Sequence, residues 1–480
     1  MPYTTIPHRL DALPWSRWHW RVVIALGITW ILDGLEVTIV GAIGPTLQRP
    51  DTLGLSASQV GLSASAYIAG AVLGALYFGR LADCYGRKRL FLVTLAVYLV
   101  ATLATAFTWN FASFAFCRFF TGVGIGGEYA AINSAIDELI PARVRGRVSL
   151  TINGSFWVGA ALGALVALIL LDPAILGPAL GWRLAFALGA LMGIAILLVR
   201  RNLPESPRWL ITHGHESEAE RAMRDIEATV RREHGHWPQP TQQIGVGLRP
   251  PPSLTGILRV LVERHRDRAV LGLTLMIAQA FFYNAIFFTY ALVLTRFYGV
   301  PDARVGLFII PFAIGNFLGP LLLGPLFDRI GRRKMIAATY ALSGITLLLT
   351  AYGFVAGWLD AWSQTAAWSI VFFLASAAAS SAYLTVSEVF PLEMRALAIA
   401  LFYAIGTGAG GFLAPALFGM LIETQSRWAV AGGYLLGAIL VLIAAGVALW
   451  LGVDAERRPL ESVATPLTAI PVQDRDGTGE

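Results

Sequence analysis

Long apolar runs separated by short polar segments make up most of the chain. Each run approaches the roughly 20 residues that an α-helix needs to cross the hydrocarbon core of a bilayer. Six runs precede a polar region and six follow it. The runs lie at 20–46, 58–80, 89–108, 111–137, 147–171, 183–200, 269–297, 303–327, 335–357, 365–387, 395–422 and 428–452. The pattern predicts an all-α integral membrane protein with twelve transmembrane helices.

Two polar loops, one in each half of the chain, carry nearly the same residues. GRLADCYGRKR begins at Gly79 and GPLFDRIGRRK begins at Gly324, an offset of 245 residues. A second pair, ELIPARVR from Glu138 and EVFPLEMR from Glu388, repeats at an offset of 250. Such repeats in a membrane protein indicate parallel bundles related by a pseudo-two-fold axis. We therefore expect two six-helix bundles.

Polar segments bound the two bundles. We expect an N-terminal segment at 1–19, bundles at 20–200 and 268–452, a linker at 201–267 and a tail at 453–480. Within the linker, residues 216–232 have the pattern of an amphipathic helix and residues 238–252 are expected to be flexible. Loop arginines and lysines fall on the side of the linker and of both chain ends. The positive-inside rule assigns that side to the cytoplasm of a cell membrane.

Composition favours a chain embedded in lipid. Of the 480 residues 56% are hydrophobic and 14% are charged, which is more apolar surface than a soluble domain of this length can bury. The net charge of +6 lies in short loops and forms no continuous basic face, so we expect no nucleic-acid partner. Cys84 and Cys117 fall at different depths and are expected to be free thiols. The first apolar run carries Asp33 and Glu36 and is expected to remain as a helix rather than act as a signal peptide.

The repeated loops and two further motifs resemble those of a known family. Arg118, Gly122 and Gly126 form an R-x-x-x-G-x-x-x-G run, and residues 204–209 read P-E-S-P-R-W. With the doubled G-x-L-x-D-x-x-G-R-[KR] type loop, the chain resembles a major facilitator superfamily transporter from about residue 20 to residue 452. The motifs are similar to those of the sugar-porter and metabolite-symporter branches. The resemblance implies transport by alternating access.

Other residues narrow the resemblance. Residues 33–36 read D-G-L-E, which is similar to the D-G-x-[DE] signature of aromatic-acid and related organic-acid proton symporters. Residues 126–128 read G-G-E, which is similar to a motif of other metabolite:proton symporters. A hexose porter would have a glutamine near Ala160, paired glutamines at Gln279 and its neighbour, a tryptophan near Tyr383 and P-E-T-K-G after the last helix. The chain has none of these four features, which argues against a hexose substrate.

Ionisable side chains inside the apolar runs are the candidates for proton coupling, because such groups are costly in a membrane unless paired or hydrated. Asp33 and Glu36 are three residues apart, so both can face the bundle centre. At about 1.5 Å per residue, Glu36 lies roughly 24 Å and Arg118 roughly 30 Å from the cytoplasmic ends of their helices, so the two can meet. Glu128 is the fourth candidate, with a hydrogen bond to neighbouring backbone as the alternative. No histidine falls in a predicted mid-membrane segment.

The pairing of a carboxylate with Arg118 suggests a coupling mechanism. A guanidinium stays charged, whereas a buried carboxylate gains or loses a proton as its surroundings change. If helix motion or an anionic substrate draws Arg118 away, the desolvated acid takes up a proton, and proton binding then follows conformation. The alternative is a static ion pair that fixes two helices.

The repeated loops carry the residues expected to close the cytoplasmic face. Carboxylates at these helix ends can bond the termini of neighbouring helices. In the second repeated motif, we expect Glu138 to act with Arg145 and Glu388 to act with Arg395. The alternative treats all these groups as solvated loop charges. The expected gate residues are Asp83, Arg87, Glu138, Arg145, Asp328, Arg332, Glu388 and Arg395.

Polar and aromatic residues are expected to line a substrate cavity between the bundles. The candidates are Asn153, Trp157, Gln279, Tyr283, Asn284, Tyr290, Tyr383 and Tyr403. Each aromatic ring has an alternative role in helix packing or at the membrane interface. The glycines at 406, 408, 410 and 411 are expected to permit close packing or bending rather than to contact substrate.

Signals for other classes of function are missing or weak. No Gly-Lys dipeptide occurs, so the chain lacks a Walker-type loop for ATP. The pairs His213/His215 and His234/His236 lie in the polar linker without cysteines and are expected to be solvated rather than metal ligands. Neither H-E-x-x-H nor G-x-S-x-G occurs to mark a hydrolase. We expect no cofactor, no metal site and no enzymatic activity.

These features predict a proton-coupled symporter that moves a small organic acid or related metabolite across the cytoplasmic membrane, with a monomer as the working unit. An exporter, antiporter or uniporter on the same fold, including one for a sugar, remains an alternative. A membrane nutrient sensor is a further alternative, although the tail at 453–480 is short for signalling. A membrane enzyme is the third alternative, and the absence of a recognisable set of catalytic residues in the sequence argues against it.

Overall fold

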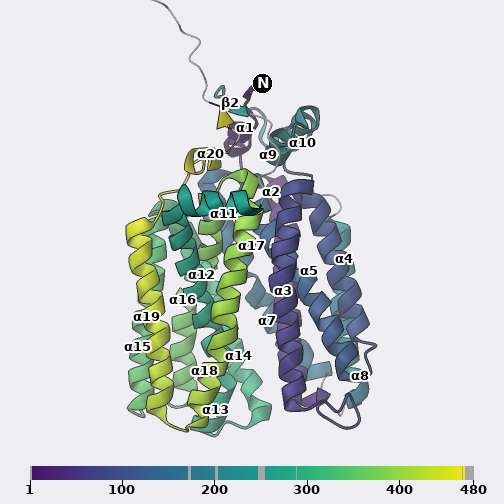
Figure 1. Ribbon diagram of the computed structural model, residues 1–480, viewed down its shortest axis with the longest axis vertical. Coiled ribbons are helices and arrows are strands. Elements are labelled where there is room, and N and C mark those ends of the chain that lie inside the picture. Colours follow the sequence, from purple (N-terminus) through teal and green to yellow (C-terminus); the bar gives the residue numbers. More distant parts are fainter. Residues whose placement is uncertain are drawn as a thin grey trace, which may run out of the picture.

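Two groups of long, nearly parallel helices form the body of the molecule (Figure 1). The computed structural model describes residues 3–170, 175–200, 204–246, 254–287, 289–467 and 469–470. Ten helices in this part of the chain are long and apolar enough to cross a membrane. Two further crossings are α5, which carries Arg118 and Glu128, and the shorter apolar α8. The fold is an all-α membrane bundle in two halves, as predicted.

The first half contains six crossings built from seven helices. The fifth crossing is divided at Ser155, whose hydroxyl donates to the carbonyl of Gly27 at 3.1 Å. Pro320 of the other half packs against Gly154. A Cβ atom on residue 154 would lie 2.9 Å from the Cβ atom of Pro320. The helices are α2 (Arg17–Leu47), α3 (Ala57–Tyr85), α4 (Arg87–Thr105), α5 (Phe111–Leu139), α6 (Arg145–Gly154), α7 (Phe156–Leu170) and α8 (Pro178–Arg200).

The second half repeats this arrangement with two divided crossings. A π-helical turn at Thr407–Gly411 joins the halves of the eleventh crossing. A Cβ atom on Gly410 would overlap the backbone of α12, so this glycine permits the close packing that the sequence suggested. The helices are α12 (Arg266–Phe287), α13 (Tyr290–Tyr298), α14 (Asp302–Arg329), α15 (Arg332–Val355), α16 (Ala361–Val389), α17 (Arg395–Gly406), α18 (Phe412–Glu423) and α19 (Arg427–Leu451).

Local signals in the sequence explain where several helices begin. Asn110 and Asp360, at an offset of 250, accept hydrogen bonds from the backbone N–H groups of Ser113 and Ser363, at 2.9 and 2.7 Å. These N-caps start α5 and α16, which are equivalent in the two repeats. Gly86 and Gly331 occupy the tight turns after α3 and α14, with φ of 93° and 114°. Only glycine adopts such angles readily, which accounts for its place in both loops.

A layer of short elements covers one end of the bundle, which we call the capped end (Figure 1). Three antiparallel strands in the order β1-β2-β3 join the start of the chain, the linker and the tail. The linker helix α10 matches the expected amphipathic segment. Strand β2 lies in the segment expected to be flexible, and residues 247–252 of that segment lie outside the described residues. The elements are β1 (Tyr3–Thr4), α1 (Ile6–Ala12), α9 (Pro207–Thr212), α10 (Glu216–His234), β2 (Ile244–Val246), α11 (Leu254–Glu263), α20 (Leu460–Val463) and β3 (Ala469–Ile470).

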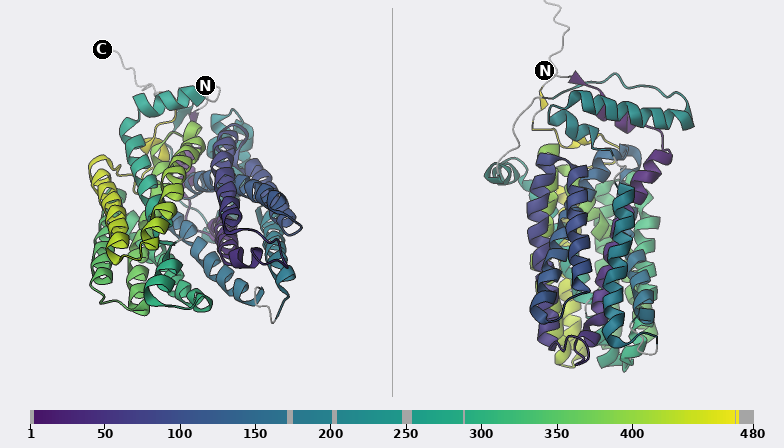
Figure 2. Two further views of the ribbon diagram at one scale, coloured as in Figure 1. Left: turned by 60° about the horizontal axis from the view of Figure 1, so that its bottom comes forward. Right: turned by 90° about the vertical axis from the view of Figure 1, so that its right-hand side faces the viewer.

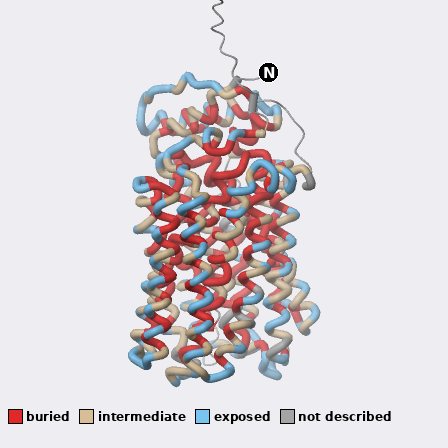
Figure 3. The backbone as a smooth tube through the Cα atoms, turned by 60° about the vertical axis from the view of Figure 1, so that its left-hand side comes forward, coloured by how far each residue is buried: buried red, intermediate tan, exposed pale blue. Residues whose placement is uncertain are grey.

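Burial follows the pattern of a protein with lipid as part of its solvent. Buried positions gather inside the bundle and between its helices, while exposed positions follow the outer faces (Figure 3). Large apolar side chains are found among the exposed ones: Val100 and Phe107 are each 70% exposed and Leu349 is 67% exposed. Apolar surface on this scale is unusual for a soluble monomer. We call these outward-facing apolar residues the lipid-facing belt.

Candidate functional site

Three charged side chains are buried together in the first half. Glu36 on α2 forms an ion pair with Arg118 on α5, through Oε1 and Nη1. Asp33, one helical turn earlier, is equally buried. The guanidinium of Arg118 also lies over the ring of Tyr67 on α3, 4.5 Å from its centroid. The structure thus brings together three of the four residues that the sequence singled out for proton coupling.

Asp33 is held by tyrosines rather than by a cation. The Tyr67 hydroxyl donates to Oδ1 at 3.2 Å, and the Tyr129 hydroxyl donates to Oδ2. Tyr67 therefore contacts Asp33 through its hydroxyl and, through its ring, the guanidinium that pairs with Glu36. Glu128, next to Tyr129 on α5, is fully buried.

A cavity of about 180 Å³ lies between the two halves, and we call it the central cavity. Asn153 on α6 donates to Asn133 Oδ1 at 3.2 Å, and Tyr283 on α12 donates to Asn316 Oδ1 at 2.7 Å, so both walls carry ordered polar groups. None of its described lining residues is ionisable as an acid or base near neutral pH. They are Trp30, Tyr129, Asn153, Phe156, Trp157, Gln279, Tyr283, Ser376, Ala379, Ser380 and Tyr383.

Aromatic rings from both halves meet around this cavity. Trp30 and Tyr129 are stacked, with centroids 4.7 Å apart and an angle of 17° between their planes. Trp157 approaches Tyr283 of the other half at 5.9 Å, and Trp30 approaches Tyr383 edge-on at 6.1 Å. Such walls favour flat, partly apolar molecules. Because Tyr129 also bonds Asp33, it connects the central cavity to the buried charges.

Five of the eight substrate candidates from the sequence line the central cavity: Asn153, Trp157, Gln279, Tyr283 and Tyr383. The other three are absent from its described lining.

Each of these three has a local contact. Tyr403 packs against Tyr129 at 5.0 Å. Asn284 donates to the carbonyl of Ala280 one turn back on α12. Tyr290 donates to the carbonyl of Val305 at 3.0 Å and serves helix packing.

The aspartates of the repeated loops join the two halves at the capped end. Asp83, at the end of α3, accepts hydrogen bonds from the backbone N–H groups of Ala396 and Leu397 at 3.2 and 3.0 Å. Asp328, at the end of α14, accepts from Gly146 and Arg147 at 3.0 and 2.8 Å. Each carboxylate therefore bonds the N-terminus of a helix in the opposite half, α17 or α6, where the helix dipole favours negative charge.

The buried arginines of the predicted gate have partners that differ from those expected. Arg87 lies 2.8 Å from Glu138, and Arg332 lies 2.9 Å from Glu388. Each glutamate therefore pairs with the arginine of the repeated loop in its own half. Arg145 instead reaches across the halves to Glu388 at 3.7 Å, because it begins α6 at the boundary between them.

Arg395, the other arginine seven residues after a glutamate, donates to the carbonyl of Phe390 at 3.3 Å. The short 3₁₀ helices Ala142–Val144 and Leu392–Met394 turn the chain at the two equivalent corners.

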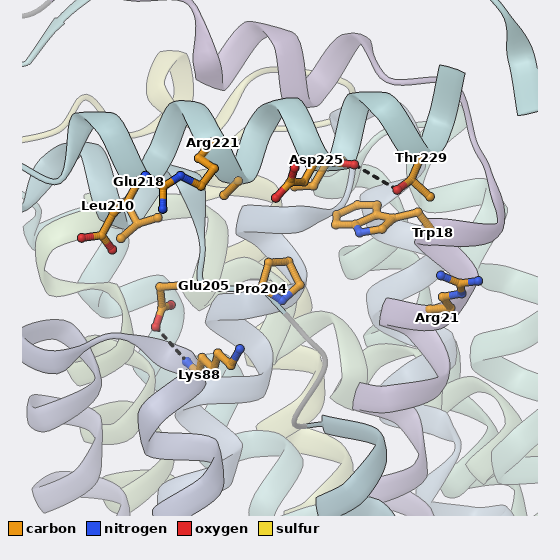
Figure 4. A pocket seen from close by; sticks show the side chains of 12 residues that line it. Trp18, Arg21, Lys88, Pro204, Glu205, Leu210, Glu218, Arg221, Asp225 and Thr229 are labelled. Atoms are coloured by element: carbon orange, nitrogen blue, oxygen red, sulfur yellow. Dashed lines mark hydrogen bonds between the residues drawn. The ribbon is translucent and has the colours of Figure 1, made fainter. Parts of the chain in front are cut away.

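A second, larger cavity of about 480 Å³ opens beneath α10 at the capped end (Figure 4). Its lining carries Arg21, Lys88 and Arg221 and also three carboxylates, so the charges balance. Glu205, one of the three, accepts backbone hydrogen bonds from Arg87 at 3.0 Å and Lys88 at 3.1 Å and so caps α4. Burial raises the pKa of Glu205, while these donors favour its ionised form.

Trp30, Tyr67 and Tyr129 were missed by reasoning from the sequence. A tyrosine or tryptophan in an apolar run gives no signal of its own, since both residue types are common in helix packing. Helical spacing did carry a signal, because Trp30 stands three residues before Asp33 and therefore on the same face. Tyr129 follows Glu128 directly, but its link to α2 depends on how the helices pack.

Comparison with known proteins agrees with this architecture. The family model described as "Sugar (and other) transporter" matches residues 16–466. The niacin transporter NiaP of Acinetobacter baylyi is 27% identical over 458 residues, 95% of this chain and 98% of that protein. The 4-hydroxybenzoate transporter PcaK of the same organism is 28% identical over 353 residues, 72% of this chain and 74% of that protein.

A solved structure supports the fold. The proton:xylose symporter XylE, of the major facilitator superfamily, superimposes with a TM-score of 0.75 at 19% identity, over 92% of this chain and 98% of that one. At this identity the likeness concerns the fold alone. The match to the family model spans both halves and the linker between them. The chain therefore belongs to the sugar (and other) transporter family, and it is a membrane transporter rather than an enzyme.

Proposed function

We propose that the chain is a proton-coupled symporter of a small organic acid, with Asp33 and Glu36 as the proton-binding groups. The observation that carries the proposal is the position of Tyr129, whose ring lines the central cavity and whose hydroxyl bonds Asp33. Binding of a substrate in the cavity can therefore alter the surroundings of the Asp33 carboxylate through the side chain of Tyr129. Arg118 completes the group as the partner of Glu36, and we propose Glu128, also on α5, as a further proton-coupling residue.

Electrostatics then favours joint binding of an anion and a proton. An anionic substrate in the central cavity meets no cation in the described lining and lies one side chain away from Asp33. Protonation of Asp33 removes the repulsion between the two negative charges. Each ligand therefore raises the affinity for the other, and the coupling is reciprocal by thermodynamic linkage. Symport follows when the transporter changes between its outward-open and inward-open conformations only with both the proton and the substrate bound.

Several features support a small substrate with a single ring. The cavity of about 180 Å³ lies below the roughly 300–1,000 Å³ common for drug-sized ligands. Asn153 and Gln279 offer amides, Ser376 and Ser380 offer hydroxyls, and the rings offer flat apolar faces. Two relatives are named as transporters of niacin and of 4-hydroxybenzoate, both small aromatic acids. We propose a substrate of that class, with Tyr283 and Tyr383 among its contacts.

We further propose that the capped end faces the cytoplasm of a cell membrane, with both termini inside and a monomer as the working unit. The concentration of arginine at this end supports the orientation. The contacts of Asp83 and Asp328 across the halves would then form a cytoplasmic gate, together with Arg87, Arg332 and the glutamates they bind. Opening this gate would release substrate inward.

Transport by purified protein in liposomes tests the proposal. With the interior made alkaline, we expect accumulation of one of the candidate aromatic acids, and loss of accumulation on adding a protonophore. Accumulation that rises when the protonophore is added indicates export instead. Dicarboxylates and sugars complete the screen of substrates.

The variant Glu36→Gln should lose accumulation against a gradient by about tenfold or more, because a neutral side chain cannot exchange a proton with the solution. Exchange of internal for external substrate should partly remain, since it requires no net proton movement. Glu423→Gln, at an exposed position, is the matched control and should behave as wild type. Proton-driven uptake at the wild-type level in Glu36→Gln would refute the role of Glu36.

A further inference from the structure

Helix α11 lies across the capped end, while the helices it precedes run along the bundle (Figure 1). Viewed from the side, it stands outside the bundle at the level where the long helices end (Figure 2). The chain turns sharply into α12 after it, with the N–H groups of Arg264 and His265 both donating to the carbonyl of Val260, at 3.0 and 3.1 Å. This turn fixes the direction in which α11 leaves the bundle.

The faces of α11 differ in polarity and in exposure. Leu258 is 42% exposed and Val262 is 66% exposed, and the two are four residues apart, so they share one outward face. Leu261 is buried and attaches the helix to the protein. Val270, 42% exposed near the start of α12, extends the apolar surface toward the lipid-facing belt. Exposed apolar positions therefore follow one another along the chain from α11 onto the membrane-crossing helix α12.

Exposed basic side chains lie close along the chain to this face. Arg259, Arg264 and Arg266 are exposed. Arg259 approaches Glu263 at 3.8 Å, but both side chains are more than 60% exposed, and an ion pair of that kind contributes little. Arg268 is occupied, since it donates to the carbonyls of Val389 and Val463 at 2.7 and 2.9 Å. The exposed guanidinium groups of Arg259, Arg264 and Arg266 therefore remain near the apolar face along the chain.

We propose that α11 is an interfacial helix that binds the anionic phospholipid head groups of the leaflet at the capped end. Leu258 and Val262 insert at the upper part of the acyl chains, and Arg259, Arg264 and Arg266 contact the phosphates. An amphipathic helix with basic residues beside a small apolar face has this behaviour in membranes. Lipid is the occupant because exposed apolar positions lead from α11 onto the membrane-crossing helix α12 and because α11 lies at the level where the long helices end (Figure 2).

Site-specific quenching tests the depth of α11 and needs no knowledge of the transported substrate. In full-length protein with Cys84→Ser and Cys117→Ser, Val262→Cys carries an environment-sensitive fluorophore in liposomes that contain lipids spin-labelled near the head group. Ala228→Cys, exposed on α10, is the matched control. We expect lipid quenching at position 262 to exceed that at position 228 by about threefold or more, and quenching by aqueous iodide to follow the reverse order. Equal quenching at the two positions, or protection of position 262 from both quenchers, overturns the proposal.

The head-group preference has its own test. Liposomes of phosphatidylcholine alone are compared with liposomes containing phosphatidylglycerol, and the anionic lipid should increase lipid quenching at position 262. The combined change Arg259→Gln, Arg264→Gln and Arg266→Gln should abolish this increase. The control changes Arg221→Gln, Arg224→Gln and Arg232→Gln on α10 should preserve it. An increase that survives loss of the three α11 arginines contradicts their role. The increase is also measured with added inorganic phosphate and with another salt at equal ionic strength. If phosphate abolishes the increase and the other salt does not, the arginines bind free phosphate rather than lipid.

Discussion

Two carboxylates one helical turn apart have different surroundings in this protein. Glu36 is bound by a guanidinium, whereas Asp33 is bound by two phenol hydroxyls. A guanidinium keeps its charge under all physiological conditions, but a phenol hydroxyl can donate to an ionised acid or accept from a protonated one. Asp33 can therefore keep both tyrosine partners while its proton comes and goes. This difference supports the proposal that Asp33 binds the coupled proton.

The variant Tyr129→Phe tests this assignment, because it retains the ring in the cavity wall and removes the hydroxyl bonded to Asp33. A hydrogen bond to a charged group contributes about 1.5–3 kcal/mol, so proton-driven accumulation should fall by about tenfold or more. Substrate exchange should change far less. Uptake is measured in liposomes across external pH, where the variant should show a displaced pH profile. Tyr383→Phe, which lines the cavity without bonding Asp33, should retain the wild-type profile; a shared displacement would assign the effect to the cavity wall.

At the scale of elements, helix ends hold the two halves together at the capped end. Asp83 and Asp328 each accept two backbone hydrogen bonds at the start of a helix in the opposite half. The repeated loop therefore recognises backbone, which explains how one short motif can serve two different neighbours, α17 and α6. Such contacts depend on distance and angle, so a small rotation of one half would break them together.

Replacing Asp83 by Asn should favour the form that is open at the capped end. The amide lacks the charge that interacts with the α17 dipole and loses acceptor capacity, a loss of about 1–2 kcal/mol, so the ratio of open to closed forms should rise by about tenfold. Spin labels at Arg89→Cys and Lys334→Cys, equivalent exposed positions in the two repeats, report the separation of the halves in a background lacking Cys84 and Cys117. The distance distribution should shift to longer values.

The matched control for that experiment is Asp360→Asn, an N-cap at the other end of the bundle. It should leave the distance distribution between the labels unchanged. A distribution in Asp83→Asn that coincides with the wild type would mean that this contact does not hold the gate closed.

At the scale of the whole molecule, three distant parts of the chain meet at one buried side chain. Arg208 of the linker lies 2.9 Å from Asp11 near the start of the chain and 3.0 Å from Glu461 in the tail. It also donates to the carbonyl of Glu138 at the end of α5 at 3.0 Å. Asp11 in turn lies 3.2 Å from Arg145. The capped end is thus tied to the gate through buried charges.

The variant Arg208→Gln should loosen this layer without unfolding the bundle. Removing one partner of a buried ion pair costs about 3–5 kcal/mol, because it leaves carboxylates without their counter-charge. Hydrogen exchange should accelerate at α1 and α20, by about a hundredfold or more, and stay unchanged in the middle of α15. Arg232→Gln on the exposed face of α10 is the control. Unaltered exchange at α20 in Arg208→Gln would show that the pair with Glu461 adds little.

The general architecture could be predicted because duplication and apolar length are visible in the sequence. The group of Asp33, Glu36 and Arg118 could also be singled out, since charges in apolar runs are rare and costly. The partners of the gate glutamates could not be predicted, because Arg87 and Arg145 are both close along the chain and only packing selects between them. The cap strands were missed because two or three residues are too few to display a periodic pattern.

The order of the strands at the capped end has a consequence for biosynthesis. Strand β2 of the linker pairs with β1 on one edge and with β3 on the other, and β3 follows the last crossing in the chain, so it is synthesised after all the crossings. Until then the sheet has two strands, and Arg208 lacks its acidic partner from the tail. The layer at the capped end is therefore completed only after every crossing of the bundle has been made.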